Sequence, residues 1–386
     1  MKRLIIIIII LAIAGGLIVG GYFMRKKGGT PSGESQPSTT LPIETGAVHP
    51  TSSVPASSGK LKQLSAVETY DYFVKNDGTI IALGIEGQIT ELKPSGEASV
   101  LSATPIKNII HSSFSYDGNK IALAFGEPDK VQVSVYDLNE KTWKPIDIRA
   151  SNFDWSPKSY EIAYLAPKGD GQLLYTWNLG EAKAKPREWI EIKAPALAPI
   201  WTRPNLILLT ERGSALIESQ LWSFDLSKKL LSPLLVNQEG LNVLAQKNGE
   251  QLLVFKSSSD QVGGGLFLVD QGGKSSRSLN FLTLPSKCFF GAHLLKSTSS
   301  EVTTSTTWLS CAIPNESLSN SQLPDDYQKK KFLINDSLYQ INLADGGIKA
   351  IFSGADLGLD ISQLKISNQK IYFVNRANQR LYALTL

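Results

Sequence analysis

Short runs of alternating apolar and polar residues fill the chain from about residue 60 to its C-terminus, and they predict a protein built of β-strands. Ile121–Phe125 is a typical run, a few residues long and preceded by a turn. The pairs Asp77-Gly78 and Asp117-Gly118 place residues that tolerate positive φ where tight hairpins require them. The region lacks the 3.6-residue apolar period of an amphipathic helix. The predicted fold class is therefore all-β.

The N-terminus has a different pattern. Residues 4–24 are 21 uncharged, mostly apolar residues, which as a helix would match the ~30 Å core of a bilayer. Tyr22, Phe23 and the bases at 25–27 are typical of an interfacial anchor. A cleaved signal peptide is the alternative, but its apolar stretch has only about 7–15 residues. We predict an uncleaved membrane anchor over residues 1–27, with the lipid bilayer as its partner.

Residues 28–58 predict a disordered stalk. They contain five prolines, abundant Ser, Thr and Gly, and only Glu34 and Glu44 as charged residues, so they cannot bury a core. Basic residues flank the anchor on both sides, and the positive-inside rule therefore does not fix its orientation. A stalk of this composition is typical of domains held off an outer membrane face. We predict that the C-terminal domain lies outside the cytoplasm.

One face of the predicted anchor helix carries small residues. Ala12, Gly16 and Gly20 follow one another at intervals of four. Small residues at this spacing let two membrane helices approach closely, so they predict a weak dimer. The alternative is that Gly and Ala are simply common in membrane helices.

A short motif recurs at regular intervals after residue 60. It consists of two or three β-forming residues, then an acidic or amide residue, and usually a leucine, as in Val135-Tyr136-Asp137-Leu138. Successive copies are 41 to 47 residues apart, except for one interval of 72. A period in the forties is that of a four-stranded propeller blade.

A second motif precedes most of these copies. Residues 114–125 read FSYDGNKIALAF, and Phe153–Pro157 begins a similar stretch. With this motif the chain resembles the TolB-like, or WD-like, β-propeller repeat family, whose blades carry FSPDGxxIAF. The resemblance covers roughly residues 60–386 and implies a β-propeller with its aromatic and β-branched residues packed between blades.

The motifs predict seven blades within residues 59–386. Six blades are the alternative, because the motifs of the fifth and sixth units are weak and the boundary between these units could be placed wrongly. The last unit, 355–386, lacks one strand, and we predict that Lys60–Ser65 supplies it. Such a strand would pair both free edges and close the ring.

The only two cysteines, Cys288 and Cys311, fall in two predicted strands of the sixth blade. A hairpin centred near residues 299–300 would place them opposite each other, so we predict a cross-strand disulfide in an oxidising compartment. Two reduced cysteines in the core are the alternative.

Charge and catalytic motifs exclude several functions. The net charge of +4 arises from 39 Lys and Arg against 35 acidic residues, and five of these bases lie in residues 1–27, which contain no acid. The rest of the chain is nearly neutral, so we expect no nucleic-acid partner. Its three His and two Cys lack zinc-ligand spacing, and phosphate-binding and hydrolase motifs are missing. We therefore predict no metal, no cofactor and no catalytic residue.

Loop lengths point to a recognition surface. In a propeller the loops between second and third strands emerge on one face, and long loops on a rigid scaffold often bind partners. The longest is predicted in blade 6, at about 314–335, with further long loops at 211–219 and 257–265. A tolerated disordered insertion is the alternative for blade 6. The candidate partner-binding residues are Glu211, Arg212, Asp325, Asp326, Tyr327, Lys329, Lys330 and Lys331, with Trp143 and Trp189 as surface anchors or inter-blade packing residues.

These observations favour a membrane-tethered, extracytoplasmic and non-enzymatic propeller that binds a protein or a cell-envelope ligand. An enzyme or carbohydrate-processing propeller with its site at the central channel is the alternative, and it would bring several polar side chains together there. A structural role at the envelope is a third hypothesis.

Overall fold

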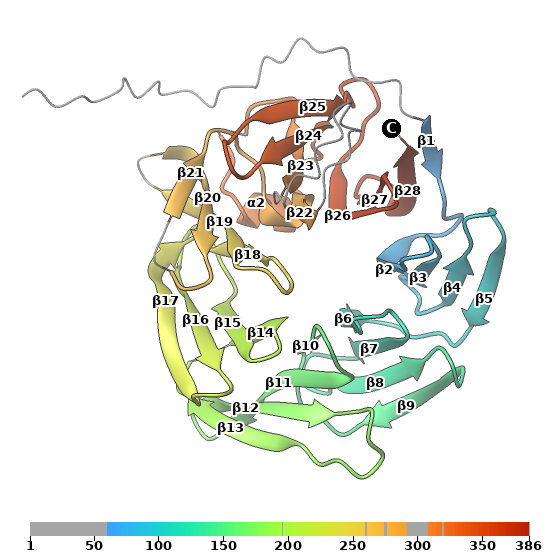
Figure 1. Cartoon of the computed structure of the whole chain (residues 1–386), viewed down its shortest axis with the longest axis vertical. Helices are drawn as coiled ribbons and strands as arrows, with labels where there is room; N and C mark the ends of the chain where they lie inside the picture. The colour runs from blue at the N-terminus through green and yellow to red at the C-terminus, as the bar shows by residue number, and fades with distance from the viewer. Residues whose placement is uncertain are drawn as a thin grey trace, which may run out of the picture. The chain divides into compact units, whose positions relative to one another are not determined.

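The computed structural model describes residues 60–385, except 195, 259–260, 274–275, 292–307 and 319. These residues form seven four-stranded antiparallel sheets, arranged as the blades of a β-propeller (Figure 1). The first strand of each blade lies nearest the centre of the ring, and the fourth lies at the rim. The prediction of seven blades is confirmed.

The first four blades each use four consecutive strands. Blade 1 contains β2 (Thr69–Val74), β3 (Ile80–Gly84), β4 (Ile89–Leu92) and β5 (Ala98–Ser102). Blade 2 contains β6 (Ile109–Phe114), β7 (Lys120–Phe125), β8 (Gln132–Asp137) and β9 (Thr142–Ile146). Blade 3 contains β10 (Phe153–Trp155), β11 (Glu161–Lys168), β12 (Gly171–Asn178) and β13 (Arg187–Ile192). Blade 4 contains β14 (Leu197–Arg203), β15 (Leu206–Glu211), β16 (Glu218–Asp225) and β17 (Leu230–Glu239).

The last three blades include two short helical segments and the closure of the ring. Blade 5 contains β18 (Asn242–Ala245), β19 (Gln251–Ser258), β20 (Gln261–Asp270) and β21 (Ser276–Leu279). Blade 6 contains β22 (Cys288–Gly291), β23 (Trp308–Pro314), β24 (Asp336–Asn342) and β25 (Ile348–Phe352). Blade 7 contains β26 (Ile361–Ser367), β27 (Lys370–Asn375), β28 (Arg380–Thr385) and β1 (Lys60–Gln63). The helical segments are η1 (Pro285–Lys287) and α2 (Asp325–Gln328).

The N-terminal strand closes the ring, as the sequence predicts. β1 runs antiparallel to β28, with Lys60 opposite Thr385 and Gln63 opposite Tyr382. The pairing continues past β1, because the Leu64 amide donates to the Leu381 carbonyl at 2.8 Å. Blade 7 therefore contains strands from both ends of the described chain.

Apolar side chains fill the space between neighbouring blades. Second strands are the most buried, and all five residues of β3 are buried because blade 1 is packed on both faces. Between blades 7 and 1, for example, Tyr72 and Ala82 pack against Tyr372 and Leu381. The β-forming residues of the repeat thus build the core one blade interface at a time.

The prediction of a long loop in blade 5 is wrong. The sequence predicts a loop over residues 257–265, but β19 and β20 pair as far as Ser258 and Gln261. Backbone hydrogen bonds need no side chains, so a glycine run can continue a ladder. Gly264, at φ +96°, occupies a tight site where an added Cβ would lie 2.5 Å from the Lys256 carbonyl oxygen.

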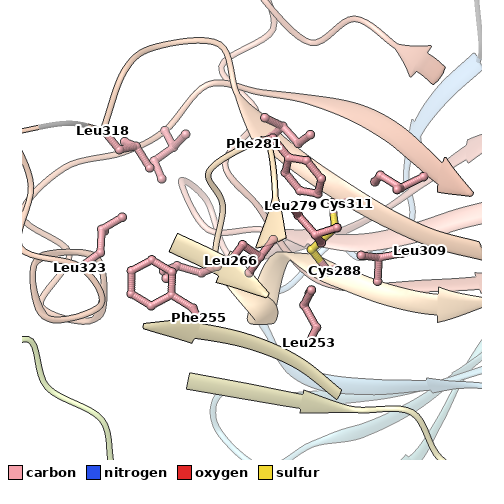
Figure 2. Close-up of a cluster of buried hydrophobic side chains, with 14 of the residues drawn as sticks. Leu253, Phe255, Leu266, Leu279, Phe281, Cys288, Leu309, Cys311, Leu318 and Leu323 are labelled. Carbon is pink, nitrogen blue, oxygen red and sulfur yellow. A yellow bond between two sulfur atoms is a disulfide. The ribbon is translucent and has the colours of Figure 1, made fainter. Parts of the chain in front are cut away.

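Cys288 and Cys311 lie directly opposite each other in β22 and β23, and their sulfurs are joined (Figure 2). Both side chains are buried in an apolar cluster between blades 5 and 6. The predicted hairpin tip near residues 299–300 lies outside the described residues.

The predicted anchor, stalk and small-residue stripe also lie outside the described residues. In the part of the chain that the structure describes, no helix combines the length and apolarity needed to cross a bilayer.

Candidate functional site

The loops between second and third strands share one end of the blades with the connections between blades, and we call this end the loop face. Blade 6 has the long insertion that the sequence predicts, residues 315–335 between β23 and β24, named here the α2 loop. Blade 4 contributes residues 212–217 between β15 and β16. The expected elaboration of the loop face therefore comes from blades 4 and 6, without blade 5.

The α2 loop folds onto the propeller through apolar side chains. Leu318, Leu323, Tyr327 and Ile334 are all buried in the cluster that also contains the disulfide. Figure 2 shows Leu323 close to Phe255 of blade 5, and Leu318, earlier in the loop, belongs to the same cluster. The described part of this loop is consequently an ordered element of the core, and the alternative of a disordered insertion is wrong for it.

Polar contacts attach the α2 loop to blade 4. The Asp325 carboxylate accepts hydrogen bonds from the Ser214 hydroxyl at 3.0 Å and from the Ala215 amide at 2.6 Å. Arg212 donates to the side-chain oxygen of Gln328 at 3.1 Å. The two insertions thus support each other, and each fixes the position of the other's tip.

Arg376, in the turn between β27 and β28, attaches the same loop to blade 7. Its guanidinium donates to the carbonyls of Tyr327 at 2.8 Å and Phe332 at 2.6 Å, and to Asp360 at 2.9 Å. The guanidinium carbon also lies 3.9 Å from the centroid of the Tyr327 ring. An always-charged planar group with five donors suits this bridging position.

A buried ion cluster lies beneath the α2 loop. The ammonium of Lys287 is inaccessible and lies 2.6 Å from Asp336 and 2.8 Å from Asp360. Asp360 also pairs with Arg376 at 2.8 Å. Two cations and two carboxylates therefore balance one another where blades 5, 6 and 7 and the α2 loop meet.

The pKa values in this cluster follow from burial and from the neighbouring charges. Burial raises the pKa of Asp336 to about 6, although Lys287 opposes the shift. Among the described residues nothing donates to its second oxygen, Oδ1. Burial alone would raise the pKa of Asp360, but Lys287 and Arg376 hold it below normal. Burial alone would also lower the pKa of Lys287, yet the carboxylates keep it above its ordinary value.

The structure brings most of the predicted site residues together but leaves few of them free. Tyr327 is buried, and Asp325 is occupied by blade 4. Asp326 pairs with Lys331 at 2.7 Å. Glu211 accepts a hydrogen bond from the Gln220 amide at 2.9 Å. Of the predicted residues, Arg212, Lys329, Lys330 and Lys331 are exposed on the loop face.

The two predicted tryptophans lie elsewhere, on rim strands. Trp143 of β9 packs against Tyr136 and donates to the Ser102 hydroxyl at 3.0 Å. Trp189 of β13 packs against Phe224 of the next blade. Both are partly buried, in keeping with the inter-blade packing alternative.

Sequence reasoning missed two exposed aliphatic residues on the loop face. Leu216 and Ile217, at the tip of the blade 4 loop, are 68% and 65% exposed. Leu333 of the α2 loop and Leu357 of the connection to blade 7 are also exposed at this end. The sequence feature that could have revealed Leu216 and Ile217 is the run Ala215-Leu216-Ile217 inside a predicted loop. Apolar residues in such a loop have no core to enter and are therefore expected to be exposed.

Charged side chains of the inner strands, and of the turn after β18, pair between blades. Asp71 of β2 accepts from the Ser112 hydroxyl at 2.6 Å and lies 3.7 Å from the ammonium of Lys365. Asp154 of β10 accepts from the Trp201 amide at 2.8 Å and pairs with Lys247. Within the described ranges, no group of three His, Cys, Asp or Glu side chains could hold a metal ion.

Solved structures share this fold. An oligogalacturonate lyase in complex with manganese matches with a TM-score of 0.57 and 11% identity, covering 86% of this chain and 94% of that one. The propeller domain of the trilobed protease from Pyrococcus furiosus, described as having an open velcro topology, matches at 0.51 and 15%, covering 82% and 94%. In contrast to that description, β1 closes the ring here.

TolB from Acinetobacter baumannii is also among the matches, with a TM-score of 0.43 and 12% identity over 81% of this chain. The chain spans 62% of the length of that TolB chain. No family model matches the sequence, and no curated protein matches it. At these identities the structural similarity establishes the β-propeller fold alone. Activity and partners have to be argued from the residues of this chain.

Proposed function

We propose that the protein is a non-enzymatic binding module, tethered to a membrane, whose loop face binds a protein of the cell envelope. The observation that carries this proposal is the exposure of Leu216 and Ile217 on an ordered loop. Ser214 and Ala215, directly before them, are bonded to Asp325 of the α2 loop. Exposed aliphatic side chains on a fixed base can dock with little loss of conformational entropy.

The exposed cations of the loop face indicate the chemistry of the partner. Lys329 and Lys330 follow α2 directly, and Arg212 is held beside it by Gln328. A partner surface with an apolar centre and acidic groups around it would complement this arrangement. The inner strands do bring polar side chains together, as the channel alternative requires, but Asp71 pairs with Lys365 and Asp154 with Lys247, so these charges are compensated within the protein.

Site-specific photo-crosslinking in intact membranes tests the proposed interface. Ile217 is replaced by a photo-reactive amino acid, and Leu230 provides the matched control. Leu230 lies in the same blade and is 54% exposed, but it belongs to the rim strand β17. We expect a discrete cross-linked protein from position 217 and none from position 230.

A charge reversal at the loop face provides a second arm of this test. Replacing Lys329 and Lys330 by glutamate should weaken the cross-link from position 217 and leave the thermal unfolding of the propeller unchanged. Equal cross-linking from both positions, or none from position 217, would contradict the proposed interface.

The tether and its orientation rest on residues 4–24 and 28–58 and have their own experiment. The chain should remain with membranes after an alkaline carbonate wash, and replacing residues 4–24 by a soluble linker should release it. Protease added to intact cells should degrade the propeller if it lies outside the cytoplasm. Release of the unaltered chain by the wash would exclude the anchor, and complete protection from the protease would reverse the orientation.

A further inference from the structure

A pocket opens at the opposite end of the blades from the loop face. It has a volume of about 330 Å³ and lies between the β2–β3 turn of blade 1 and the β6–β7 turn of blade 2. Its walls include the rings of Phe73 and Tyr116 and the polar side chains of Lys75, Asp77 and Asn119. Its polar residues belong to the turns of the repeat motif, and the proposed partner surface lies at the other end of the blades.

Hydrogen bonds between neighbouring turns hold the pocket open in one shape. Lys75 donates to the side-chain oxygen of Asn119 at 2.9 Å, which joins blade 1 to blade 2. Asp117 accepts from Asn119 at 2.6 Å and from the Tyr160 hydroxyl of blade 3 at 2.6 Å. Asn368 of blade 7 donates to the backbone of the blade 1 turn at 2.9 Å. Four successive blades therefore fix the walls before any ligand binds.

Gly118 allows the aromatic floor of the pocket. Its φ is +70°, and a Cβ added there would lie 2.3 Å from the ring of Phe73. Only glycine satisfies both the turn and this close approach. The Phe73 ring can consequently pack directly against the neighbouring turn.

The groups left available in the pocket define its ligand. Tyr116 is 46% exposed and offers an aromatic face, while its ring centroid lies 5.5 Å from that of Tyr160. Asp77 uses one carboxylate oxygen for the Thr79 amide at 2.9 Å, and this hydrogen bond lowers the pKa of Asp77, so the other oxygen is an ionised acceptor. The Lys75 ammonium keeps further N–H donors beyond its bond to Asn119, and the Asn119 amide, bonded to Lys75 and Asp117, keeps one N–H.

We propose that this pocket is a binding site for an uncharged saccharide. A sugar ring has an apolar face that can lie on Tyr116 and hydroxyl groups that both donate and accept, which Lys75 and Asp77 can satisfy together. The lining carries one ammonium, Lys75, and two carboxylates, Asp77 and Asp117, and this balance disfavours an acidic ligand. The site lies on a different face from the proposed protein interface, and each can fail without the other.

The test is binding of the full chain to immobilised uncharged and acidic oligosaccharides. The chain is held in a zwitterionic detergent, because detergents with sugar head groups would compete for the pocket. We expect binding to at least one uncharged oligosaccharide, with little dependence on salt. Tyr116→Ala and Asp77→Asn should each weaken it about tenfold.

Lys158→Ala is the matched control. Lys158 is exposed on the equivalent turn of blade 3 and outside the pocket, so its loss should leave saccharide binding unchanged. Unchanged thermal unfolding of Tyr116→Ala would show that weaker binding is not a folding defect. The proposal is overturned by an absence of binding, by equal binding of the Tyr116→Ala chain, or by binding of acidic oligosaccharides alone that high salt abolishes.

Discussion

Lys287 is the residue on which the seam between blades 6 and 7 depends. Its side chain is fully buried, and its charge is balanced by carboxylates located 49 and 73 positions later in the chain, at Asp336 and Asp360. Asp336 also accepts from the Ile361 amide at 2.7 Å, so the same carboxylate holds the first strand of blade 7. Removing one partner of such a cluster leaves a buried charge without compensation.

Lys287→Met should therefore lower the free energy of unfolding by about 3–5 kcal/mol. Urea unfolding followed by tryptophan fluorescence measures the loss. Lys158→Met, at an exposed position, should change stability by less than about 0.5 kcal/mol. A loss below about 1 kcal/mol for Lys287→Met would show that the cluster is dispensable.

The raised pKa of Asp336 predicts a dependence of stability on pH. Because its folded pKa of about 6 exceeds the ordinary value of 3.8, the folded state binds more protons than the unfolded state between these values. The contribution of Asp336 to stability therefore falls as the pH rises from about 4 to about 6. Asp336→Asn removes this fall, so the stability of the variant relative to the wild type should increase from pH 4 to pH 7. Unfolding curves at several pH values test the direction, and a constant difference would contradict it.

At this scale the sequence predicts little of the site. Lys287 and Arg376 look like surface residues, since their partners are distant in the chain and only the fold brings them together. The pairing of Cys288 with Cys311 was predictable because the two residues are equally far from the expected centre of the hairpin, which places them opposite each other. The prediction that Tyr327 is available to a partner is wrong. Its neighbours in the sequence are charged and indicate an exposed loop, but its ring is buried in the core.

The α2 loop shows at the scale of elements how an insertion becomes part of a scaffold. Its apolar residues enter the cluster between blades 5 and 6, and its polar groups bind blades 4 and 7. Sequence patterning located the insertion correctly because the repeat interval lengthens there to 72 residues. Sequence patterning wrongly predicted a loop at the glycines 263–265. The hydrogen bonds of a β-ladder join backbone groups, which glycine has like every other residue.

Loosening the α2 loop should make it sensitive to trypsin without unfolding the propeller. Asp325→Ala removes two hydrogen bonds, each worth about 0.5–1.5 kcal/mol, so cleavage after Lys329, Lys330 or Lys331 should accelerate about tenfold. Gel electrophoresis and mass spectrometry of the fragments follow the rate.

Asp356→Ala is the matched control for this proteolysis, since Asp356 is an exposed carboxylate in the connection between β25 and β26. Its cleavage rate should equal that of the wild type. Equal rates for Asp325→Ala and the wild type would mean that the apolar contacts alone hold the loop.

At the largest scale, the described residues form a ring whose integrity depends on one pair of strands from opposite ends of the described chain. The other six blades take all four strands from one continuous segment, whereas blade 7 takes β1 from the N-terminal side. The sequence predicts this arrangement because the last unit is one strand short. Apart from the disulfide, the sequence therefore predicts the architecture more fully than it predicts the contacts between side chains.

Deletion of residues 60–65 should lower the melting temperature of the entire ring, because β28 loses its outer partner β1 and no strand then joins the two ends of the propeller. Near-ultraviolet circular dichroism reports on this transition through the buried Trp155 and Trp201, in blades 3 and 4. Deletion of residues 50–55 shortens the preceding segment by the same amount and should have no effect. Equal melting temperatures for the two deletions would show that closure contributes little.

The position of β1 also has a mechanical consequence. Any tension transmitted along the chain from residues before Lys60 reaches the ring first at the four residue pairs between β1 and β28. Those pairs would separate before any blade made from one continuous segment is strained. The strand that completes the ring is thus also the point at which pulling on the N-terminal segment would begin to open it.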